Sequence, residues 1–399
     1  MKVLYIHQYF KTPEEPGGTR SYWVAQELLK RKHEVTFLTT RPNQAEKIMD
    51  TMIDGLRVIS FKVPYSQNMG LIQRFKSFTH FMQQATKHGL KQKDIDLVIA
   101  TSTPLTVGYP ALRIKSKLRV PYIFEVRDLW PEVPIQMGVL NNPVLKALAK
   151  WFEKKIYRNA AHVVALSPGM QDGVIKYIPA TKTSMIPNMA KIDEFWPRSA
   201  NEELMLSVGL RKESFKVIHF GALGLANGAD YIIKAAAILK DLQDVEFVFA
   251  GGGSTEDALK AKCVEMRLSN VHFIGKYPMS QISEIVNFCD VSVVTFMDLP
   301  ILYTNSPNKL FDSLSAGKPI IVNSAGWTKK LVEEERCGYY VDPKNPKELA
   351  DRILYLKTHP DDANVLGLNS RKLAETKYDK SILCNQFGNL VDSLVSSNV

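Results

Sequence analysis

The sequence predicts an α/β protein of two Rossmann-like domains, each a parallel sheet with helices on both faces. Three observations lead to this fold class. Short apolar runs alternate with amphipathic stretches along the whole chain, which is the pattern of parallel strands joined by helices. The length of 399 residues suits two domains of roughly 190 residues each. Both halves also open alike, with a strand, a glycine-containing loop, a helix and a strand.

Strands are expected where short apolar runs are bounded by polar residues. In the first half they lie near Val3–Tyr9, Val35–Thr39, Leu97–Ala100, Tyr122–Val126 and Val163–Leu166. In the second half they lie near Val217–Phe220, Glu246–Ala250, Val271–Ile274, Val291–Val294, Ile320–Val322 and Tyr339–Val341. Ligands of such sheets bind beyond the carboxyl ends of the strands, so two facing domains would hold one in a cleft between them.

The stretch Met185–Pro197, with its prolines and weak periodicity, is the expected crossing between the domains. We therefore place a first domain at residues 1–188 and a second at 189–378. A C-terminal helix follows over 379–399, with packing back on the first domain as one arrangement.

The net charge of +10 is unevenly distributed. Residues 1–190 hold 27 Lys and Arg against 14 Asp and Glu, a balance of +13, and the remainder holds 24 against 27, a balance of −3. Such an excess suits an anionic membrane face or a phosphorylated substrate. Zinc-finger spacing, an RNA-binding aromatic motif and a basic tail are all missing, so nucleic acid is not expected as a partner.

Segment lengths and cysteine spacing indicate the compartment. No apolar run reaches ~18 residues, and the start of the chain resembles a first strand more than a signal peptide. The four cysteines show neither close pairs nor metal-ligand spacing. A cytoplasmic location is expected.

Residues 304–319 form the stretch around which we organise the candidate site. Ser306 and Pro307 predict a helix start, with the serine side chain capping the first amides. Helix amides with Lys309 beside them suit a phosphate group, and Asp312 lies one turn further on. The alternative is an ordinary cap followed by a surface Lys/Asp pair.

Two motifs in the first half follow predicted strands. The loop Pro16–Arg20, with Gly17 and Gly18, would let the backbone approach a ligand closely, or would be a plain turn. Arg127 and Asp128 come just after a strand and could reach a cleft, or could form a structural ion pair.

Other polar features are weaker. The triplet Gly251–Gly253 lacks the glycine at position 256 that a dinucleotide fingerprint requires. Asp94 and Asp96 resemble a metal-binding pair but precede their strand, at the wrong end of the sheet, so no metal is expected. His7 and His219 are interpreted as core histidines.

The segment Leu71–Lys93 carries Phe78, Phe81, Met82 and Ala85 at helical spacing, with basic residues around them. A basic amphipathic helix can lie on an anionic membrane. It can equally pack its apolar stripe into a core.

Several motifs together resemble the family 4 glycosyltransferases over most of the chain. They are Gly17-Gly18, Ser167–Met170, Ile186–Asn188 with Asp193 and Phe195, and Asp312–Pro319. The resemblance implies a GT-B fold, a nucleotide sugar held mainly by the second domain, an acceptor facing the first, transfer with retention, and no metal or cofactor. The segments Ile6–Phe10 and Arg127–Glu132 are similar to a bacterial surface-polysaccharide branch that includes proteins described as L-fucosamine transferases.

The chain departs from the family pattern at several positions. The usual pair of glutamates falls at Thr304 and Asp312, and the usual phosphate-binding Arg and Lys fall near Ala222 and Asn227. Arg127 stands where a histidine is often found. These departures put the donor geometry in question more than the class of enzyme.

We therefore expect a metal-independent glycosyltransferase that acts in O-antigen or capsule biosynthesis, peripheral on the inner face of the cell membrane. It would move a hexose or acetamido sugar from a nucleotide-diphosphate donor to a lipid-linked, undecaprenyl-type saccharide. UDP is the favoured nucleotide, and UDP-N-acetyl-L-fucosamine or another HexNAc donor is a first choice. An NAD-type oxidoreductase and a non-catalytic sugar-nucleotide binding subunit are the alternatives. The candidate catalytic residues are Arg127 and Asp128. The candidate donor-binding residues are Gly17, Gly18, Gly221, Gly251, Tyr277, Thr304, Ser306, Asn308, Lys309, Leu310 and Asp312.

Overall fold

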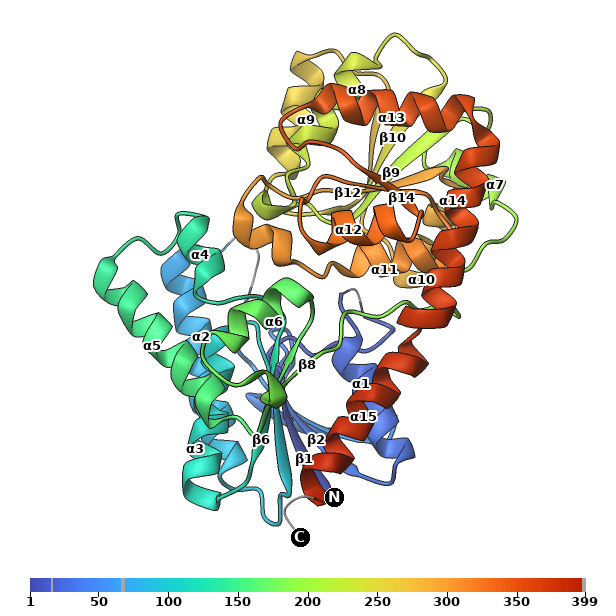
Figure 1. The fold of residues 1–399 in the computed structure, drawn as a ribbon. Coiled ribbons are helices and arrows are strands. Elements are labelled where there is room, and N and C mark those ends of the chain that lie inside the picture. Colours follow the sequence, from blue (N-terminus) through green and yellow to red (C-terminus); the bar gives the residue numbers. More distant parts are fainter. Residues whose placement is uncertain (16, 66–68, 397–399) are drawn as a thin grey trace. The chain divides into compact units, whose positions relative to one another are not determined.

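The computed structural model describes residues 1–15, 17–65 and 69–396, which form two compact α/β units (Figure 1). The first unit is built on residues 1–13 and 17–187 together with the C-terminal helix from Ser381, and the second on Asn188–Lys380. Pro16 of the expected glycine loop and the last three residues of the chain lie outside the described residues. The predicted class, two Rossmann-like units with parallel sheets, is confirmed.

The first unit has an eight-stranded sheet in the order β3-β4-β2-β1-β5-β6-β7-β8. Its strands are β1 (Lys2–Ile6), β2 (Glu34–Thr40), β3 (Ile48–Ile53), β4 (Leu56–Phe61), β5 (Leu97–Thr101), β6 (Tyr122–Val126), β7 (His162–Ala165) and β8 (Thr183–Met185). Every neighbouring pair is parallel except β3 and β4, which form an antiparallel hairpin at the sheet edge. The expectation of a strand over Val3–Tyr9 was too long, because β1 ends at Ile6, and β3, β4 and β8 were not expected.

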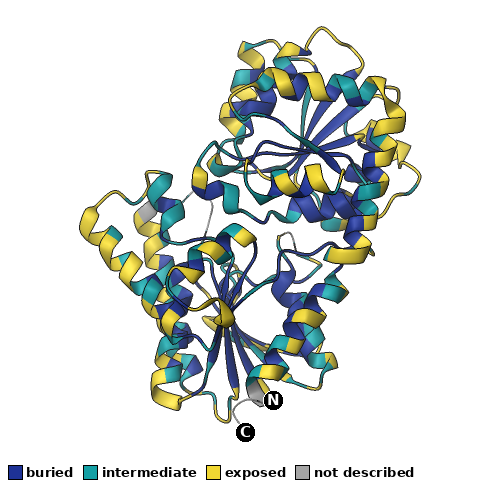
Figure 2. Ribbon diagram, in the orientation of Figure 1, coloured by how far each residue is buried: buried dark blue, intermediate teal, exposed yellow. Residues whose placement is uncertain are grey.

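Helices cover both faces of this sheet, and the strands between them are buried (Figure 2). They are α1 (Arg20–Lys30), α2 (Leu71–Gly89), α3 (Gly108–Leu118), α4 (Glu132–Gln136), α5 (Pro143–Asn159), α6 (Pro168–Ile175) and α15 (Lys380–Ser396), with 3-10 turns at Leu105–Val107 and Ala180–Lys182.

The C-terminal helix α15 packs within the first unit. Phe387 and Val391 on this helix are fully buried. Asp392 accepts hydrogen bonds from Arg31 (2.6 Å) and pairs with His33 (2.9 Å) beyond the end of α1. The last residues of the chain therefore complete the core that the first residues begin.

The apolar stripe expected on the segment Leu71–Lys93 faces the protein interior. On α2, Phe81 and Ala85 are fully buried, so the interpretation of this stripe as a lipid-facing surface was wrong. Among the side chains of α2 whose burial is described, Ile72 and Phe75, near its start, are exposed apolar ones. The periodicity of the sequence indicated an apolar stripe, but not whether that stripe faces a membrane or the protein core.

The second unit has a six-stranded parallel sheet in the order β11-β10-β9-β12-β13-β14. The strands are β9 (Phe215–Ala222), β10 (Val245–Gly252), β11 (Val271–Gly275), β12 (Val291–Val294), β13 (Ile320–Val322) and β14 (Gly338–Tyr340). All six correspond to predicted strands. Apolar clusters fill both faces, so the sheet is the middle of three layers.

The helices of the second unit follow its strands in order. They are α7 (Glu202–Ser207), α8 (Asp230–Ile238), α9 (Glu256–Glu265), α10 (Met279–Phe288), α11 (Asn308–Ser315), α12 (Trp327–Glu334), α13 (Pro346–Thr358) and α14 (Pro360–Leu373), with 3-10 turns at Leu225–Asn227 and Pro300–Thr304 and a π-helical turn at Ala374–Tyr378. Among the described residues of the whole chain, no helix combines the length and apolarity needed to cross a membrane.

Candidate active site

In the first unit, Arg127 lies just beyond β6, as the sequence predicted. Its backbone N–H donates to Ser102 Oγ (3.0 Å), and its guanidinium Nη1 lies 3.5 Å from His7 Nε2. The other ring nitrogen, Nδ1, lies 2.6 Å from Ser21 Oγ. Because a guanidinium can only donate, Nε2 is the acceptor, and the ring hydrogen sits on Nδ1 and is donated to Ser21. Burial, reinforced by the Arg127 charge, holds the pKa of His7 well below its ordinary value.

Asp128 follows Arg127 at the same edge of the sheet. Burial raises the pKa of its carboxyl to about 6, and the positive charge of Arg127 opposes that rise. A carboxyl with such a pKa can hold or release a proton near neutral pH. The two predicted catalytic residues thus stand together with His7 at the carboxyl ends of β1 and β6.

The glycine loop joins β1 to α1. Gly17 has a φ of +135°, a conformation that favours glycine, and Gly18 is partly exposed beside it. Arg20, at the start of α1, is buried. Its Nε donates to Glu125 Oε1 (2.7 Å), and its Nη atoms donate to the carbonyls of Ile186 and Pro187. The hydrogen bonds of the Arg20 guanidinium are therefore made inside the unit.

In the second unit, helix α11 begins one residue later than predicted, and Ser306 does not cap it. Pro307 is the N-cap residue, and α11 runs from Asn308. Ser306 Oγ instead accepts the backbone N–H of Asn188 (3.2 Å), and its carbonyl accepts from the Asn188 side chain. The serine was misread because its hydrogen-bond partner lies 118 residues away in sequence. The amides of Asn308 and Lys309 still belong to the first turn, where no intrahelical acceptor exists.

Lys309 is the cation that this helix start places at the carboxyl end of β9. Its Nζ lies 3.1 Å from His219 Nε2, and its side chain is 9% exposed. A Cβ atom built on Gly221 would lie 3.7 Å from Lys309 Cε, so the lysine runs alongside that glycine. His219 Nδ1 lies 3.1 Å from Val293 O, which can only accept, so Nε2 carries the lone pair that faces Lys309.

The charge of Lys309 is not paired with an acidic side chain in the described part of the chain. Burial lowers the pKa of the ammonium to about 7. Among the residues that the structure describes, no carboxylate lies within ion-pair distance of Nζ. Burial and the neighbouring Lys309 also hold the pKa of His219 well below its ordinary value, so the imidazole is neutral at pH 7. A buried ammonium whose side-chain partner is a neutral ring keeps an uncompensated positive charge, which favours binding of an anion.

Asp312 lies one turn along α11, but it does not share the surroundings of Lys309. Its Oδ1 lies 3.2 Å from Lys191 Nζ, and both side chains are buried. Burial raises the pKa of the Asp312 carboxyl to about 6, and the Lys191 charge opposes that rise. The surface Lys/Asp pair that the sequence offered as an alternative is therefore wrong, because each side chain is buried with a different partner.

The two candidate glycines of the second sheet, Gly221 and Gly251, have different surroundings. A Cβ atom on Gly251 would lie 1.8 Å from Gly221 O, so position 251 must be glycine for β9 and β10 to pair. Gly221 itself has a φ of +99° and is exposed at the strand end. Only Gly221 adjoins Lys309. The requirement for Gly251 is structural.

The remaining candidates surround the same edge of the second sheet. Thr304 ends a 3-10 turn, and its Oγ1 donates to Ile301 O (2.7 Å). Leu310 is fully buried, which limits it to a backbone contact with any ligand. Asn308 is partly exposed at the first position of α11, and Tyr277 is partly buried after β11, against the core cluster that contains Phe220.

Ala222 and Asn227 occupy the positions where the family cations were expected. Ala222 is exposed directly after Gly221, and the Asn227 carbonyl accepts a hydrogen bond from Thr295 Oγ1 (2.8 Å). Neither residue supplies a positive charge. Lys309 therefore supplies a positive charge beside Gly221, next to the position where the family pattern has a cation.

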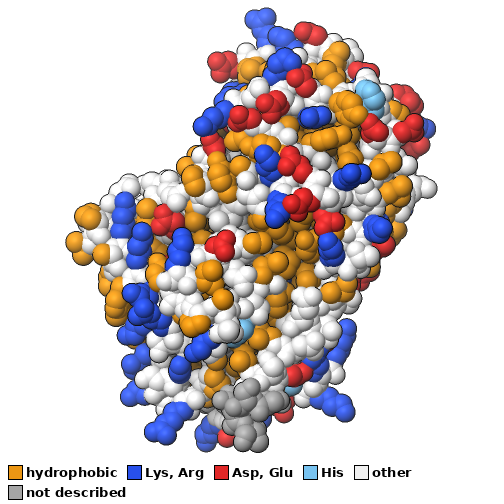
Figure 3. Space-filling model, viewed as in Figure 1, with side chains coloured by type: hydrophobic (Ala, Val, Ile, Leu, Met, Phe, Trp, Pro, Cys, Tyr) orange, Lys and Arg blue, Asp and Glu red, His pale blue; other side chains and the backbone are white. Residues whose placement is uncertain are grey.

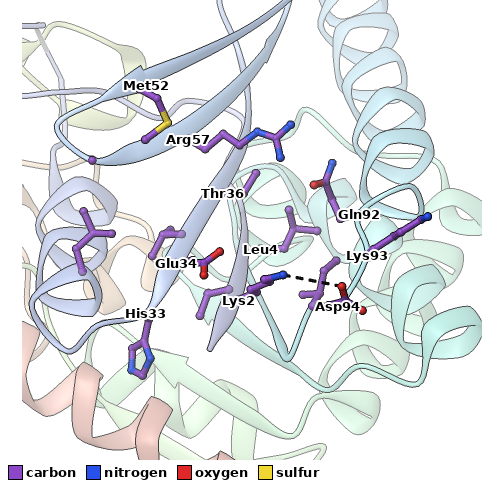
Figure 4. A pocket seen from close by; sticks show the side chains of 15 residues that line it. Lys2, Leu4, His33, Glu34, Thr36, Met52, Arg57, Gln92, Lys93 and Asp94 are labelled. Atoms are coloured by element: carbon purple, nitrogen blue, oxygen red, sulfur yellow. Dashed lines mark ion pairs between the residues drawn. The ribbon is translucent and has the colours of Figure 1, made fainter.

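At the opposite edge of the first sheet, a hollow of about 530 Å³ with a mixed polar and apolar lining includes Asp94 (Figure 4). Asp94 Oδ2 lies 3.9 Å from Lys2 Nζ, and Asp96 Oδ2 accepts the backbone N–H of Lys2 (2.7 Å). Both carboxylates thus belong to the amino-terminal edge of the sheet, far along the strands from Arg127 and Asp128. In the described part of the chain, no group of three or more His, Cys, Asp or Glu side chains has an arrangement that could hold a metal ion.

Solved structures share this fold over nearly the whole chain. Sucrose-phosphate synthase from Thermosynechococcus elongatus superposes with a TM-score of 0.79 at 17% identity, covering 99% of both chains. The Anabaena protein HepE, solved in complex with UDP and glucose, superposes with a TM-score of 0.71 at 19% identity, covering 98% of this chain and 100% of that one.

Sequence relatives cover similar shares of the chain. A probable glycosyltransferase, WbjE of Pseudomonas aeruginosa, is 24% identical and covers 85% of each chain. The N,N'-diacetylbacillosaminyl-diphospho-undecaprenol alpha-1,3-N-acetylgalactosaminyltransferase of Campylobacter jejuni is 22% identical over 94% of this chain and 95% of its own.

Two family models match, one in each unit. The glycosyl transferase 4-like domain matches residues 17–189, and glycosyl transferases group 1 matches residues 201–373. The chain is a GT-B glycosyltransferase. The expected assignment to this family is thereby confirmed. The assignment to L-fucosamine transferases is more specific than the family that these matches establish.

The contacts of three residues near the glycosyltransferase's candidate site were not predicted from the sequence. These residues are Arg20, Lys191 and His219. Arg20 contacts Glu125 and Ile186, and Lys191 contacts Asp312, all more than 100 residues away, and local spacing does not indicate such contacts. Lys191 also has a local partner, Glu194, at 3.5 Å. His219 offered one sign, because a buried imidazole between apolar residues of a central strand needs polar partners for its ring nitrogens.

Proposed function

We propose that this glycosyltransferase transfers a sugar, with retention, from a nucleotide-diphosphate donor to a lipid-linked saccharide at the inner face of the cell membrane. UDP is the favoured nucleotide. The observation that carries the proposal is the buried Lys309 ammonium, which lies beside Gly221 and near the start of α11 and has no carboxylate partner among the described residues. A diphosphate would supply the missing negative charge.

In this proposal, different residues of the second unit bind different parts of the donor. Lys309 and the amides of Asn308 and Lys309 bind the diphosphate, because helix-start amides and an ammonium both favour phosphate oxygens. Asp312, fixed by Lys191, accepts the ribose hydroxyls. As the sugar bond breaks, the departing diphosphate gains negative charge, and a cation fixed beside it stabilises the transition state more than the bound donor.

In the first unit, Arg127 and Asp128 act on the reacting sugar or on the acceptor. Asp128, with its raised pKa, can exchange a proton with an acceptor hydroxyl near neutral pH. Arg127 is held by Ser102 and His7 and offers a fixed positive charge. No metal is required in this scheme, because Lys309 and the helix amides stabilise the leaving group.

The comparisons support the substrate classes. HepE was solved with UDP and glucose, and the Campylobacter relative is named for an acceptor on diphospho-undecaprenol. For this chain we propose a lipid-linked acceptor of O-antigen or capsule biosynthesis. UDP-N-acetyl-L-fucosamine and other UDP-HexNAc donors are the first to be tested.

Calorimetry of the purified chain with UDP and with NAD tests the nucleotide, and binding of NAD in preference to UDP would contradict the proposal. A mass-spectrometric screen of UDP-sugars against a lipid-linked acceptor extract then identifies the donor. Binding of UDP-sugars without any transfer would favour a non-catalytic subunit. NMR of the product linkage tests retention, and an inverted anomeric centre would refute that part.

A further inference from the structure

Helix α5 of the first unit presents an apolar face to solvent. Its inward face is formed by Glu153, Ile156 and Tyr157, all buried. On the outward face, Val144, Leu148 and Trp151 follow one another at helical spacing and are 72%, 56% and 55% exposed. A surface helix ordinarily turns its polar side to water, so the outward face of α5 is the reverse of the usual pattern.

The apolar surface extends beyond these three side chains. Leu145 is 50% exposed on the same helix, and Val139, just before it, is 44% exposed. Figure 3 shows hydrophobic side chains gathered at the margin of the first unit over the start of α5. Contiguous exposed apolar surface of this kind marks an interaction site rather than ordinary surface scatter.

The charges around this face are mainly positive, although one of its lysines, Lys150, pairs with Glu132 (3.4 Å). Helix α5 carries the cations Lys146, Lys150, Lys154, Lys155 and Arg158. Its one acidic residue, Glu153, points inward, and burial raises the pKa of that carboxyl to about 7. Lys155 Nζ lies 4.8 Å from the Trp151 ring centre, at the point where the apolar and basic parts of the face meet.

We infer that the outward face of α5 docks on a bilayer that contains anionic lipids. Leu148 and Trp151 would enter the region between headgroups and acyl chains, and the lysines would reach the phosphates with their aliphatic stems along the apolar face. The basic charge distinguishes this surface from an ordinary protein interface, whose central residues are depleted in Lys. The inference deepens the proposed function by naming the residues that meet the membrane, where a lipid-linked acceptor resides.

The test uses the full chain and vesicles that contain no acceptor, of phosphatidylcholine alone or with phosphatidylglycerol. Leu148→Ser with Trp151→Ser should reduce binding to the anionic vesicles by roughly tenfold or more, because two apolar anchors are lost. Raising the salt from about 0.1 M to about 0.5 M should weaken wild-type binding, because exposed charges are screened. Val365→Ser with Leu368→Ser, two exposed side chains on α14 of the second unit, is the matched control and should bind as the wild type.

UDP calorimetry on each variant separates this inference from the proposed function. The α5 variant should bind UDP as the wild type, which also shows that it is folded. Equal vesicle binding by the α5 variant and the wild type would overturn the inference. So would a wild-type dimer that the α5 substitutions dissociate, since that result would assign the face to a second copy of the chain. Failure of UDP to bind the wild type would contradict the proposed function and leave the vesicle result unaffected.

A second observation, independent of the first, concerns His219 and rests on the proposed role of Lys309. His219 is bonded on one side to Val293 O, so its position is fixed, and its other nitrogen accepts from Lys309 Nζ. A carboxylate at this place would neutralise the lysine, whereas a neutral acceptor orients it and leaves its charge available to a ligand. We propose that His219 is a positioning residue for Lys309.

Substitutions at position 219 distinguish this role from simple packing. His219→Phe keeps a ring but removes the acceptor, and His219→Gln restores an acceptor. The phenylalanine variant should weaken UDP binding by roughly tenfold, the value of one hydrogen bond to a charged group, and the glutamine variant should recover part of it. His162→Gln, at another buried strand histidine, is the control and should leave UDP binding unchanged. Equal UDP affinity of the Phe variant and the wild type, with the wild type binding normally, would overturn the proposal.

Discussion

Substitution of Lys309 by alanine is the sharpest test of the donor site. The change removes the ammonium beside Gly221 and leaves the backbone of α11 in place. Since the side chain is 9% exposed and sits with a neutral histidine, its charge is poorly screened by water and is not cancelled by a neighbour. The helix amides that remain supply only a partial charge. The reaction should therefore slow strongly.

The magnitude can be set by comparison with other preorganised groups. Loss of one donor that stabilises a developing anion costs about 10² to 10³ in kcat, or about 3 to 4 kcal/mol. We expect Lys309→Ala to fall in this range, with a smaller change in the KM of the donor, because the charge on the diphosphate grows as the bond breaks. Lys309→Arg should keep part of the activity, limited by the broader guanidinium.

Steady-state kinetics with the UDP-sugar found in the donor screen measure both constants. Lys309→Met preserves most of the side-chain volume and separates loss of charge from loss of packing. Lys318→Met is the control, because Lys318 is another partly buried cation of the second unit, bonded to Asn287 O (2.6 Å) at the far end of α11. Ala222→Arg combined with Asn227→Lys should partly rescue Lys309→Ala if these positions share one diphosphate. Near-normal kcat and donor KM in Lys309→Ala would refute the reasoning.

Four further predictions concern the charged groups of the protein and its independence of metal. Burial lowers the pKa of Lys309 to about 7, so the empty site loses the positive charge of its ammonium as the pH rises. The Kd for UDP should therefore increase by up to about tenfold per pH unit above 7. In Lys309→Met the Kd should not change with pH over this range. Glu125→Ala strands the buried Arg20 guanidinium and should lower the free energy of unfolding in urea by about 3 to 5 kcal/mol. Asp50→Ala, which breaks the exposed pair with Arg57, should cost less than about 1 kcal/mol by the same measurement. Transferase activity should survive excess chelator, and a loss that manganese restores would contradict the leaving-group scheme.

The sheets could be predicted where each strand contains a short apolar run. All six strands of the second unit appear as short apolar runs, and such runs have few alternatives in a chain with this α/β rhythm. The edge hairpin of the first unit was missed because β3, Ile-Met-Asp-Thr-Met-Ile, is largely exposed and its apolar residues do not alternate with polar ones. Its turn, Asp54-Gly55, was a usable signal, since both residues adopt positive φ, +49° and +81°, in a two-residue hairpin.

The positions of the candidate residues relative to helices and strands could be predicted from the sequence, but their contacts could not. Spacing placed Lys309 at a helix start and Arg127 after a strand, because both positions follow from local structure. The partners of Lys309 and Asp312 depend on which distant segments the fold brings against α11, namely β9 at His219 and the segment that contains Lys191. Local sequence patterns do not show which distant residues these side chains contact. The expected Ser306 cap failed for the same reason, since tertiary hydrogen bonding overrode a strong local preference.

The return of α15 to the first unit has a consequence for how the chain is made. The first unit is interrupted by residues 188–380, a stretch of 193 residues, before Ser381 resumes it. At ribosomal rates of about 5 to 20 residues per second, roughly 10 to 40 s separate synthesis of Pro187 from synthesis of α15. Until then the places of Phe387 and Val391 in the core are unfilled, and Arg31 lacks Asp392. The amino-terminal unit, although translated first, is the last to acquire its complete native core.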